Sequence, residues 1–402
     1  MAHLPDYPEA INSSCNWPWP TMATEPVELN EAIGRRLAEP IVADRDLPPF
    51  NRAALDGYAM RHADLQQSDT FQVVATVAAG QPATVDVPPG TCVAIATGAP
   101  VPETLDMVIP HERSDRGDRN GAPVRFQSTD LPAGNAIHLR GADAGKDDVL
   151  VQPGTRLAPA HLGLAAAVGL DAVTVRTRPR VHLLTSGDEI VNRTCDPLPH
   201  QVRNSNGPML GGLIERMGAV LAAHHHVPDE PDDVRAALET ALATADVVVT
   251  VGGISAGDRD FIPPMLDALG VTTLLAGAAI QPGRPIRVAR DNSGTMVVSL
   301  PGNPVSVLAM ACLFLWPVLH AKLGCAAPVP WREITLARDV QPNPRRSQFR
   351  PAVLDAAGDA TVPHWQGSGD LAHTAETDGL VALPMQDQPV PAGTRLPFLP
   401  WP

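Results

Sequence analysis

Three short loops carry the residues of this chain that could do chemistry, and each loop follows an apolar run. They read "TSGDE" at 185–189, "GGISAGDRD" at 252–260 and "PGNP" at 301–304. Glycine-rich turns can offer backbone amides to a phosphate or another oxyanion, and carboxylates suit a divalent cation or the N–H and O–H donors of a ligand. The predicted binding residues of these loops are Ser186, Gly187, Asp188, Glu189, Gly252, Gly253, Ser255, Gly257, Pro301, Gly302 and Asn303.

The second loop resembles a nucleotide-binding loop only in part. Gly252 and Gly257 have the spacing of a P-loop, but that motif requires lysine next, and this chain has Asp258. The glycine spacing also excludes the dinucleotide-binding fingerprint. An oxyanion cradle with the hydroxyl of Ser255 is still compatible with the loop, provided that a cation lies between the anion and Asp258 or Asp260. Taken alone, the loop also fits a tight strand-to-helix turn with solvated acids.

The elements that precede the loops predict where the loops meet. From about residue 180 to 323, strand-like runs alternate with helical patterns, which indicates a parallel sheet with crossover helices. The runs "RVHLL", "DVVVTV" and "MVVSL" lead into the three loops, so the loops should share the carboxyl edge of the sheet, where ligands bind in such folds. Asn303 and Pro304 fit the N-cap and first position of a helix, whose positive end would face the same edge.

Outside this segment, the patterns predict smaller units. Residues 50–129 read as short strands and turns of a β-rich domain. The spacing of Leu29, Ile33 and Leu37 within 26–42 predicts a helix that stops at Pro40, and 157–170 predicts a helix of small residues. The proline-rich tail from 328 to 402 has short extended runs typical of a small β-barrel or sandwich.

Composition limits the partners and the compartment. The chain has 402 residues and a formal net charge of −14, which argues against nucleic acid and anionic membrane surfaces. The five cysteines include no pair at metal-ligand spacing, so we expect reduced thiols in a cytoplasm. The apolar run 305–316 is too short to cross a bilayer, and Pro317 follows it. The run "HHH" at 224–226 predicts an edge-strand or surface role rather than a metal site.

Motifs along nearly the whole chain resemble the MoeA and gephyrin E-domain family of molybdopterin molybdenumtransferases. The motifs are "LPPFNRAALDGYAM", "AIATGAPVPETLDMVIPHE", "GNAIHLRGADAGKDDVL", "LLTSGDEI", "VGGISAGDRDF", "SLPGNPVSV", "QFRPAVL" and "WQGSGDLAHTAETDGLVALP". Each motif is modest by itself, and their common order makes the resemblance specific.

The resemblance implies a multidomain fold with α/β and β parts. It has a three-layer α/β pterin-binding domain with a parallel-type sheet, a β-rich domain, an extended linking domain and a C-terminal β-barrel. The expected bounds are 1–49 with 134–178 for the N-terminal linking domain, 50–133 for the β-rich domain, 179–327 for the α/β domain and 328–402 for the barrel. The family forms an elongated homodimer, with the active site between the α/β domain of one subunit and the β-rich domain of the other.

The resemblance also implies an activity in molybdenum cofactor biosynthesis. With a divalent cation, expected to be Mg²⁺, the family inserts molybdate into adenylylated molybdopterin and releases AMP. Expected protein contacts are the molybdopterin adenylyltransferase and recipient molybdoenzymes. Carried over by position, the implied catalytic residues are Asp56, Thr97, Asp143 and Asp260, the implied metal ligands are Asp56, Glu189 and Asp260, and Arg284, Arg350 and Ser368 join the loop residues as binding residues.

Several positions depart from the family pattern. These are Arg52, Ala142, Asn204, Gly277 and Gln281; of these, Gly277 and Gln281 stand where the family has lysines, and Arg284 replaces another lysine. Loss of ammonium groups should weaken oxyanion binding, although the guanidinium of Arg284 could compensate. Two alternatives therefore stay open beside the transferase: a weakened paralogue that binds or carries the cofactor without inserting metal, and an unrelated phosphate-ester hydrolase.

Overall fold

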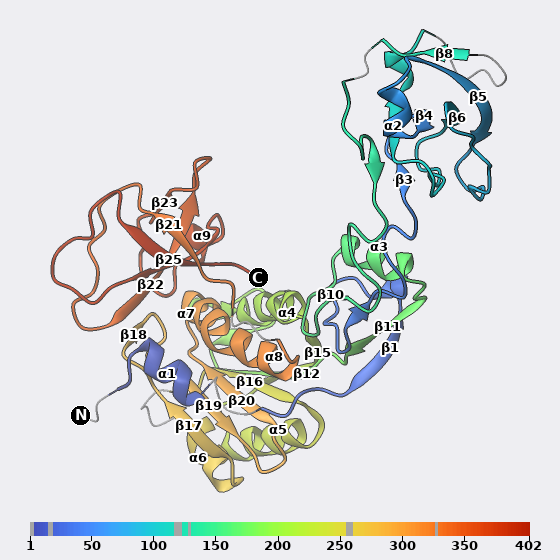
Figure 1. Ribbon diagram of the computed structural model, residues 1–402. Helices are drawn as coiled ribbons and strands as arrows, with labels where there is room; N and C mark the ends of the chain where they lie inside the picture. Colours follow the sequence, from blue (N-terminus) through green and yellow to red (C-terminus); the bar gives the residue numbers. More distant parts are fainter. Residues whose placement is uncertain (1–3, 15–18, 116–122, 128–129, 255–259, 326–328) are drawn as a thin grey trace.

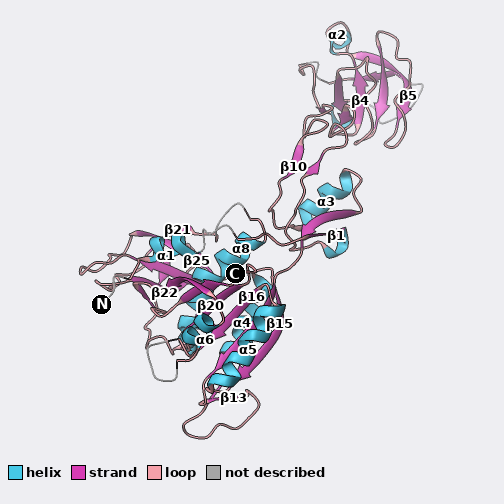
Figure 2. Ribbon diagram, turned by 90° about the horizontal axis from the view of Figure 1, so that it is seen from below, coloured by secondary structure: helices cyan, strands magenta, loops and turns pink. Residues whose placement is uncertain are grey.

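The computed structural model describes residues 4–14, 19–115, 123–127, 130–254, 260–325 and 329–402. The molecule is elongated, as both ribbon views show (Figures 1 and 2). A β-rich domain lies at one end and is joined by a narrow linking region to an α/β domain, on which a C-terminal β domain packs. The two ends of the chain both lie in the wider, two-domain part.

The α/β domain is built on a six-stranded mixed sheet. Its strand order is β15 (Val220–Val227), β12 (Arg180–Ser186), β16 (Val247–Val251), β20 (Met296–Leu300), β19 (Arg287–Arg290) and β17 (Thr272–Ala276). The first four strands pair in parallel, as the alternation of strands and helices predicts. β19 pairs antiparallel with both β17 and β20, so the expectation of a parallel-type sheet is wrong for this edge. The connections 277–286 and 291–295 are too short to contain a crossover helix.

Helices cover both faces of this sheet. They are α4 (Asn206–Arg216), α5 (Pro231–Thr244), α6 (Ile262–Ala268), α7 (Pro304–Met310) and α8 (Trp316–Lys322). One apolar core lies between the sheet and α4, α7 and α8, and a second lies between the sheet and α5 and α6. Because both faces are buried, the central strands β16 and β20 are apolar or uncharged throughout and buried at every position.

The apolar run 305–316 after the third loop is part of a longer helical segment. This segment extends from Pro304 to Lys322 and passes Pro317. A π-helical stretch, Ala311–Leu315, comes just before the proline and adjusts the backbone hydrogen bonding there. By length and composition this segment could cross a membrane, but 78% of its most apolar window is buried inside the protein, as in a core helix.

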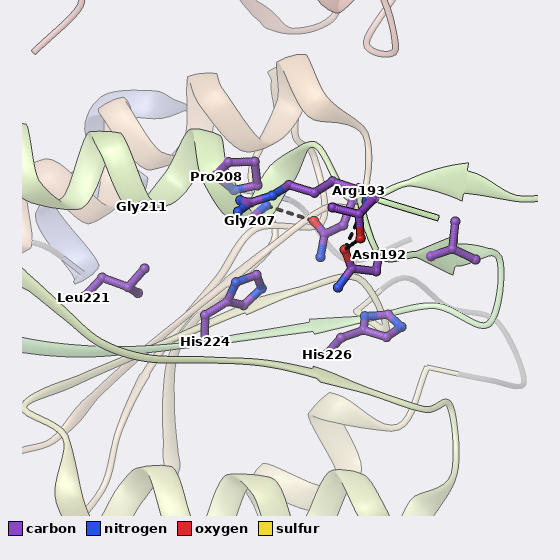
Figure 3. A pocket seen from close by; sticks show the side chains of 11 residues that line it. Asn192, Arg193, Gly207, Pro208, Gly211, Leu221, His224 and His226 are labelled. Atoms are coloured by element: carbon purple, nitrogen blue, oxygen red, sulfur yellow. Dashed lines mark hydrogen bonds between the residues drawn. The ribbon is translucent and has the colours of Figure 1, made fainter. Parts of the chain in front are cut away.

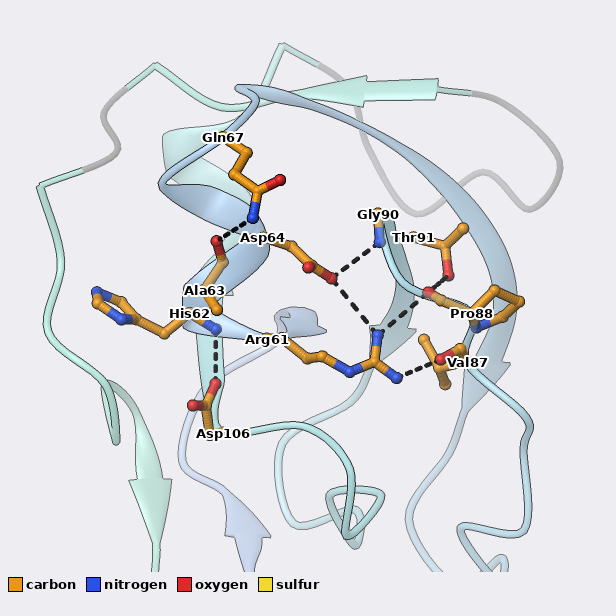
Figure 4. Close-up of polar contacts among 10 residues, drawn as sticks. All are labelled: Arg61, His62, Ala63, Asp64, Gln67, Val87, Pro88, Gly90, Thr91 and Asp106. Atoms are coloured by element: carbon orange, nitrogen blue, oxygen red, sulfur yellow. Dashed lines mark hydrogen bonds and ion pairs between the residues drawn. The ribbon is translucent and has the colours of Figure 1, made fainter.

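The β-rich domain contains the sheet β7 (Met107–Pro110), β4 (Gly57–Met60), β6 (Thr91–Ile95), β5 (Thr70–Val77) and β8 (Pro123–Arg125), in that order. A polar network fixes the start of β6 (Figure 4). Asp64, on the short helix α2 (His62–Leu65), accepts hydrogen bonds from Gly90 N (2.9 Å) and from Arg61 (3.4 Å). Arg61 also donates to the carbonyls of Val87 and Pro88. This network positions the strand that leads to Thr97.

Gly57 lies at the most crowded glycine position of this domain. A Cβ there would lie 2.1 Å from the carbonyl oxygen of Ile109 on β7. We expect Gly57→Ala to destabilise the domain by about 3 kcal/mol because backbone atoms must separate. Gly163→Ala is the control, since its Cβ would meet no atom within 4 Å on helix α3 (Pro159–Ala167) and should stabilise that helix by about 0.5–1 kcal/mol. Calorimetric unfolding checks both; equal melting temperatures for the two variants would contradict the prediction.

In the linking region, the structure has strands where the sequence predicts a helix. Instead of a helix over 26–42, the chain forms β1 (Thr24–Glu28), a short 3₁₀ turn (Leu29–Glu31) and β2 (Ile41–Val42). β1 pairs antiparallel with β11 (Ala172–Arg176), and β2 pairs with β10 (Val149–Val151). Pairing with distant strands overrides the local helical spacing, and the left-handed backbone at Gly34 (φ +74°) interrupts any helix.

The C-terminal domain is a small β structure. Its strands are β21 (Arg332–Thr335), β22 (Ser347–Leu354), β23 (Ala360–Thr361), β24 (Gly379–Leu383) and β25 (Arg395–Pro400). They pair in the order β23-β22-β24-β25-β21, and a bridge between Leu336 and Ala360 joins the ends of this row. At the start of β22, Ser347 and Gln348 pair with β18 (Ile280–Gln281) of the α/β domain. The N-terminal helix α1 (Tyr7–Ser14) also connects the two domains, because the Tyr7 ring contacts Phe314 and Phe349.

Candidate active site

The three predicted loops meet at the carboxyl ends of β12, β16 and β20. They surround a cavity of about 460 Å³. The predicted residues that line this cavity are Ser186, Gly187, Glu189, Gly252, Gly253, Asp260, Gly302 and Asn303. Thus residues from separate parts of the chain, with two carboxylates among them, face one space. Ser255 and Gly257 lie outside the described residues.

Glycines allow the first two loops to touch. Gly187, Gly252 and Gly253 have φ values of +130°, +90° and +61°, which side chains rarely adopt. A Cβ on Gly252 would lie 3.0 Å from the carbonyl oxygen of Ser186. Gly252 also donates its N–H to the carbonyl oxygen of Leu300 at the end of β20 (3.1 Å). The wall of the cavity is therefore held by backbone contacts between all three strand ends.

The C-terminal domain reaches the third loop. Asn303 stands at the N-cap of α7 and Pro304 at its first position, as predicted, but the Asn303 side chain does not cap the helix. Its Nδ2 donates instead to Ser368 Oγ (2.8 Å), and Val305 N donates to the Ser368 carbonyl (3.0 Å). Gly369 lines the cavity beside them. Ser368 thus adjoins the predicted site although it is distant in sequence.

Other predicted binding residues lie outside the cavity lining. Asp188 is beside it and accepts a long hydrogen bond from Asp229 N (3.4 Å), while Pro301, the first residue of the third loop, is buried. Arg350 lies on β22, where it stacks over the Trp365 ring at 5.0 Å and donates to the Pro363 carbonyl (3.4 Å). Burial lowers the pKa of the Arg350 guanidinium.

Arg284 faces a different cavity. It lines a space of about 330 Å³ together with Gly277 and Arg287. Gln281, at the other lysine position, accepts a hydrogen bond from Asn343 Nδ2 (2.6 Å). The positive charge of Arg284 therefore does not lie among the residues that line the main cavity, where the compensation was expected.

Six polar residues that line the main cavity were not predicted as binding residues: Thr185, Arg203, Asn204, Ser205, Asn206 and Asp229. Asn206 is 8% exposed and donates to the Gly302 carbonyl (2.8 Å), while its Oδ1 has no partner in the described part of the chain. A buried acceptor without a donor is costly unless a ligand supplies one. The polar run "RNSN" at 203–206, which leads into α4, was the available signal for Asn204 and Asn206.

A second group of predicted residues lies in and beside the β-rich domain. Asp56 Oδ1 accepts hydrogen bonds from Thr97 N (2.6 Å) and Thr97 Oγ1 (2.7 Å). These two hydrogen bonds hold the pKa of the Asp56 carboxyl below its usual value, and the nearby His111 makes a smaller contribution in the same direction. The other carboxylate oxygen, Oδ2, makes no hydrogen bond to the described residues, so an ionised oxygen is left exposed for a cation or substrate.

Asp143 is oriented by an unusual chain of side chains. Arg52 donates to Nδ1 of His138 (3.2 Å), and His138 Nε2 lies 2.9 Å from Asp143 Oδ1. Because a guanidinium can only donate, Nδ1 of His138 must accept, and its proton lies on Nε2, facing Asp143. Arg52, one of the departures from the family pattern, therefore helps to position Asp143.

The two groups are far apart within one chain. Asp56 directly precedes β4 and Thr97 follows β6 in the β-rich domain, while Asp143 lies between β9 (Ile137–His138) and β10. The main cavity lies in the α/β domain, which is well separated from the β-rich domain (Figures 1 and 2). Within the described ranges, no three His, Cys, Asp or Glu side chains form a group that could hold a metal ion. A single chain therefore does not bring the predicted metal ligands Asp56, Glu189 and Asp260 together.

Thr97 provides a test of how Asp56 is kept ionised. Thr97→Val removes the hydroxyl bond but keeps the backbone N–H bond, so the pKa of Asp56 should rise. A carboxylate with a lowered pKa keeps its charge until the pH falls through that value, so the acidic limb of the pH–activity profile should move to higher pH. Thr91→Val is the control, because the Thr91 hydroxyl donates only to the Pro88 carbonyl. The same shift in both variants would disconnect the limb from Asp56.

Comparisons with known proteins cover almost the entire chain. Residues 6–169 match the MoeA N-terminal region (domain I and II), 182–321 match the probable molybdopterin binding domain, and 333–401 match the MoeA C-terminal region (domain IV). A crystal structure of the molybdopterin biosynthesis MoeA protein from Pyrococcus horikoshii has a TM-score of 0.85 and 27% identity, covering 99% of this chain and 100% of that chain.

Fold and comparisons together define a protein of molybdenum cofactor biosynthesis with the MoeA domain set. The curated molybdopterin molybdenumtransferases of Synechococcus elongatus and Bacillus subtilis are 33% and 32% identical to it. These matches cover 93% of the chain and 93% of the first relative, and 90% of the chain and 86% of the second. The chain belongs to the molybdopterin molybdenumtransferase family, which is a family of enzymes.

Proposed function

We propose that the chain inserts molybdate into adenylylated molybdopterin and releases AMP, with the help of a divalent cation. The observation that carries the proposal is the cavity at the three strand ends, with its glycine cradle, three carboxylates and the unpaired acceptor of Asn206. Backbone amides suit a phosphate group, and the N–H groups of a pterin ring suit a buried carbonyl acceptor. The cavity volume lies in the range of small-molecule sites.

The active site needs a second copy of the chain in this proposal. Asp56 and Asp143 would approach the main cavity of a partner subunit, because they cannot reach the cavity of their own chain in this arrangement. An elongated chain with a half-site at each end suits a two-fold dimer, which would assemble two complete sites. The dimer thereby explains why the acidic residues of one chain are divided between distant domains.

The residues present fit a divalent cation, expected to be Mg²⁺. Asp56 Oδ2, Glu189 and Asp260 would hold it when the two half-sites meet, and carboxylate oxygens are its preferred protein ligands. When bound, the cation would neutralise charge on the phosphate oxygens. Thr97 keeps Asp56 ionised and fixed for this role, His138 keeps Asp143 oriented, and the glycine loops place the phosphates.

The deciding experiment separates transfer from carriage. The pure protein is incubated with adenylylated molybdopterin, molybdate and magnesium, and AMP and protein-bound molybdenum are measured. AMP release with stoichiometric metal incorporation is the expected result. Tight pterin binding without AMP release would contradict the proposal and favour a carrier, with the substitutions at Gln281 and Gly277 as the first explanation to test by restoring lysine.

A further inference from the structure

A second cavity lies at the β15 edge of the sheet (Figure 3). It has a volume of about 590 Å³ and opens between α4, the edge strand β15 and the loop 191–194. His224 and His226 point into it from β15, and Arg193 reaches over it from the loop. The remaining residues that line it are Val191, Asn192, Thr194, Asn204, Gly207, Pro208, Gly211 and Leu221.

The ionisable side chains that line this cavity are all basic, although the protein as a whole is acidic. The chain has 44 acidic and 30 basic residues, yet none of the described residues that line the cavity is Asp or Glu. Arg193, His224 and His226 can all carry positive charge, and Arg193 forms no hydrogen bond or ion pair with the described residues. A guanidinium beside two imidazoles that can take up a proton, with no carboxylate among the lining residues, favours binding of an anion.

Small residues on α4 create the space. Gly207 and Gly211 present no side chain toward β15, and a Cβ on Gly207 would lie 2.3 Å from Cε1 of His224. The contact with α4 partly buries the His224 ring, and burial lowers the pKa of His224, with further lowering by His225, His226 and Arg193. An anion in the cavity would favour the charged form of the ring and reverse this shift.

Hydrogen bonds connect this cavity to the main one. Thr185 Oγ1, at the edge of the main cavity, lies 3.3 Å from His224 Nε2 and 3.3 Å from His226 Nδ1. Asn204 lines both cavities and donates to the same Thr185 hydroxyl (3.1 Å). The two spaces are therefore neighbours that share one polar wall.

We propose that the cavity formed by Arg193, His224 and His226 is an accessory binding site for a phosphoryl dianion, beside the main site and distinct from its glycine cradle. Guanidinium and imidazolium groups give charge-assisted hydrogen bonds to phosphate oxygens, and Asn192 and Asn204 add amide groups. The dianion can be free inorganic phosphate or the phosphoryl group of a mononucleotide. The apolar walls of Val191, Pro208 and Leu221 leave room for the larger ligand.

The probes are inorganic phosphate and AMP, added to the full-length protein without pterin or molybdate. Histidine ring signals are followed by NMR, with signals assigned by substitution, and affinity is measured by calorimetry. Phosphate should raise the pKa of His224 and His226, while Arg193→Gln and His224→Gln should each weaken binding about tenfold. His225→Gln is the matched control, because His225 is adjacent on the same strand but does not line the cavity.

Gly207→Ala adds a test that removes no charge. Its methyl group should displace the His224 ring and weaken binding as well. AMP binding at least tenfold tighter than phosphate identifies a nucleotide as the occupant, and equal affinities identify free phosphate; both outcomes support the site. Unchanged His224 and His226 signals at saturating phosphate, or equal affinity in the wild type and His224→Gln, would overturn it. Since no turnover is measured, either result leaves the proposed transfer reaction to be judged by its own experiment.

Discussion

Asp56→Asn is expected to lower the rate of molybdate insertion about 100-fold or more, with little change in the affinity for adenylylated molybdopterin. Asparagine can still accept both hydrogen bonds from Thr97 through Oδ1, so the local structure should persist. What is lost is the negative charge and the second carboxylate oxygen, which the proposed mechanism uses only when the half-sites meet. Loss of a group that acts in the reacting complex lowers kcat rather than raising KM.

A neighbouring aspartate provides the matched control for this prediction. Asp69 is also in the β-rich domain and also has a lowered pKa, because of hydrogen bonds from Arg125 and Thr70. Asp69→Asn should leave AMP release and metal incorporation within about twofold of the wild type, since surface substitutions away from a site have small effects. Equal losses in Asp56→Asn and Asp69→Asn would mean that Asp56 has no special role.

Pairing two inactive variants is expected to restore activity. A heterodimer of an Asp56→Asn chain and a Glu189→Gln chain contains one site with both substitutions and one site with neither. If each site combines the β-rich domain of one chain with the main cavity of the other, this heterodimer should have about half of the wild-type activity. Each homodimer should be nearly inactive. Differently tagged chains, co-expressed and purified through both tags, allow the measurement.

The reciprocal heterodimer makes the test decisive. A chain with both substitutions is paired with a wild-type chain, so that every composite site carries one defect. This heterodimer should be nearly inactive if the sites cross between chains, and about half active if each chain contains a whole site. Activity in this pairing together with none in the first one would reject the composite site and require Asp56 to act within its own chain.

Much of the fold follows from local pattern. The runs at 180–184, 247–251 and 296–300 lie in strands of one sheet, and α7 begins at Pro304 after the predicted N-cap residue Asn303. These elements agree with sequence reasoning because their apolar periodicity and their tertiary burial coincide. The helix predicted within 26–42 is wrong because local spacing and tertiary pairing disagree there. Thr24–Glu28 pairs with a strand far along the chain, and this pairing overrides the helical spacing.

Some residues of the candidate site could be identified from the sequence, and others depend on tertiary packing. Gly187, Gly252 and Gly302 could be identified from sequence, because loops after parallel strands must share an edge. Arg284 could not be placed correctly, since whether its side chain faces the main cavity or the space beside Gly277 depends on the path of 277–286 between two domains. The unpaired acceptor of Asn206 and the contact between Asn303 and Ser368 also depend on such packing.

The sequence by itself determined the family, the elements of the α/β domain and the three loops, because those features depend on residue type and short spacing. The tertiary structure alone decided that the β-rich domain with Asp56 lies far from the α/β domain with Glu189, and that His224, His226 and Arg193 surround a cavity without carboxylates. Such relations are set by how distant segments pack. Short-range spacing in the sequence does not encode them.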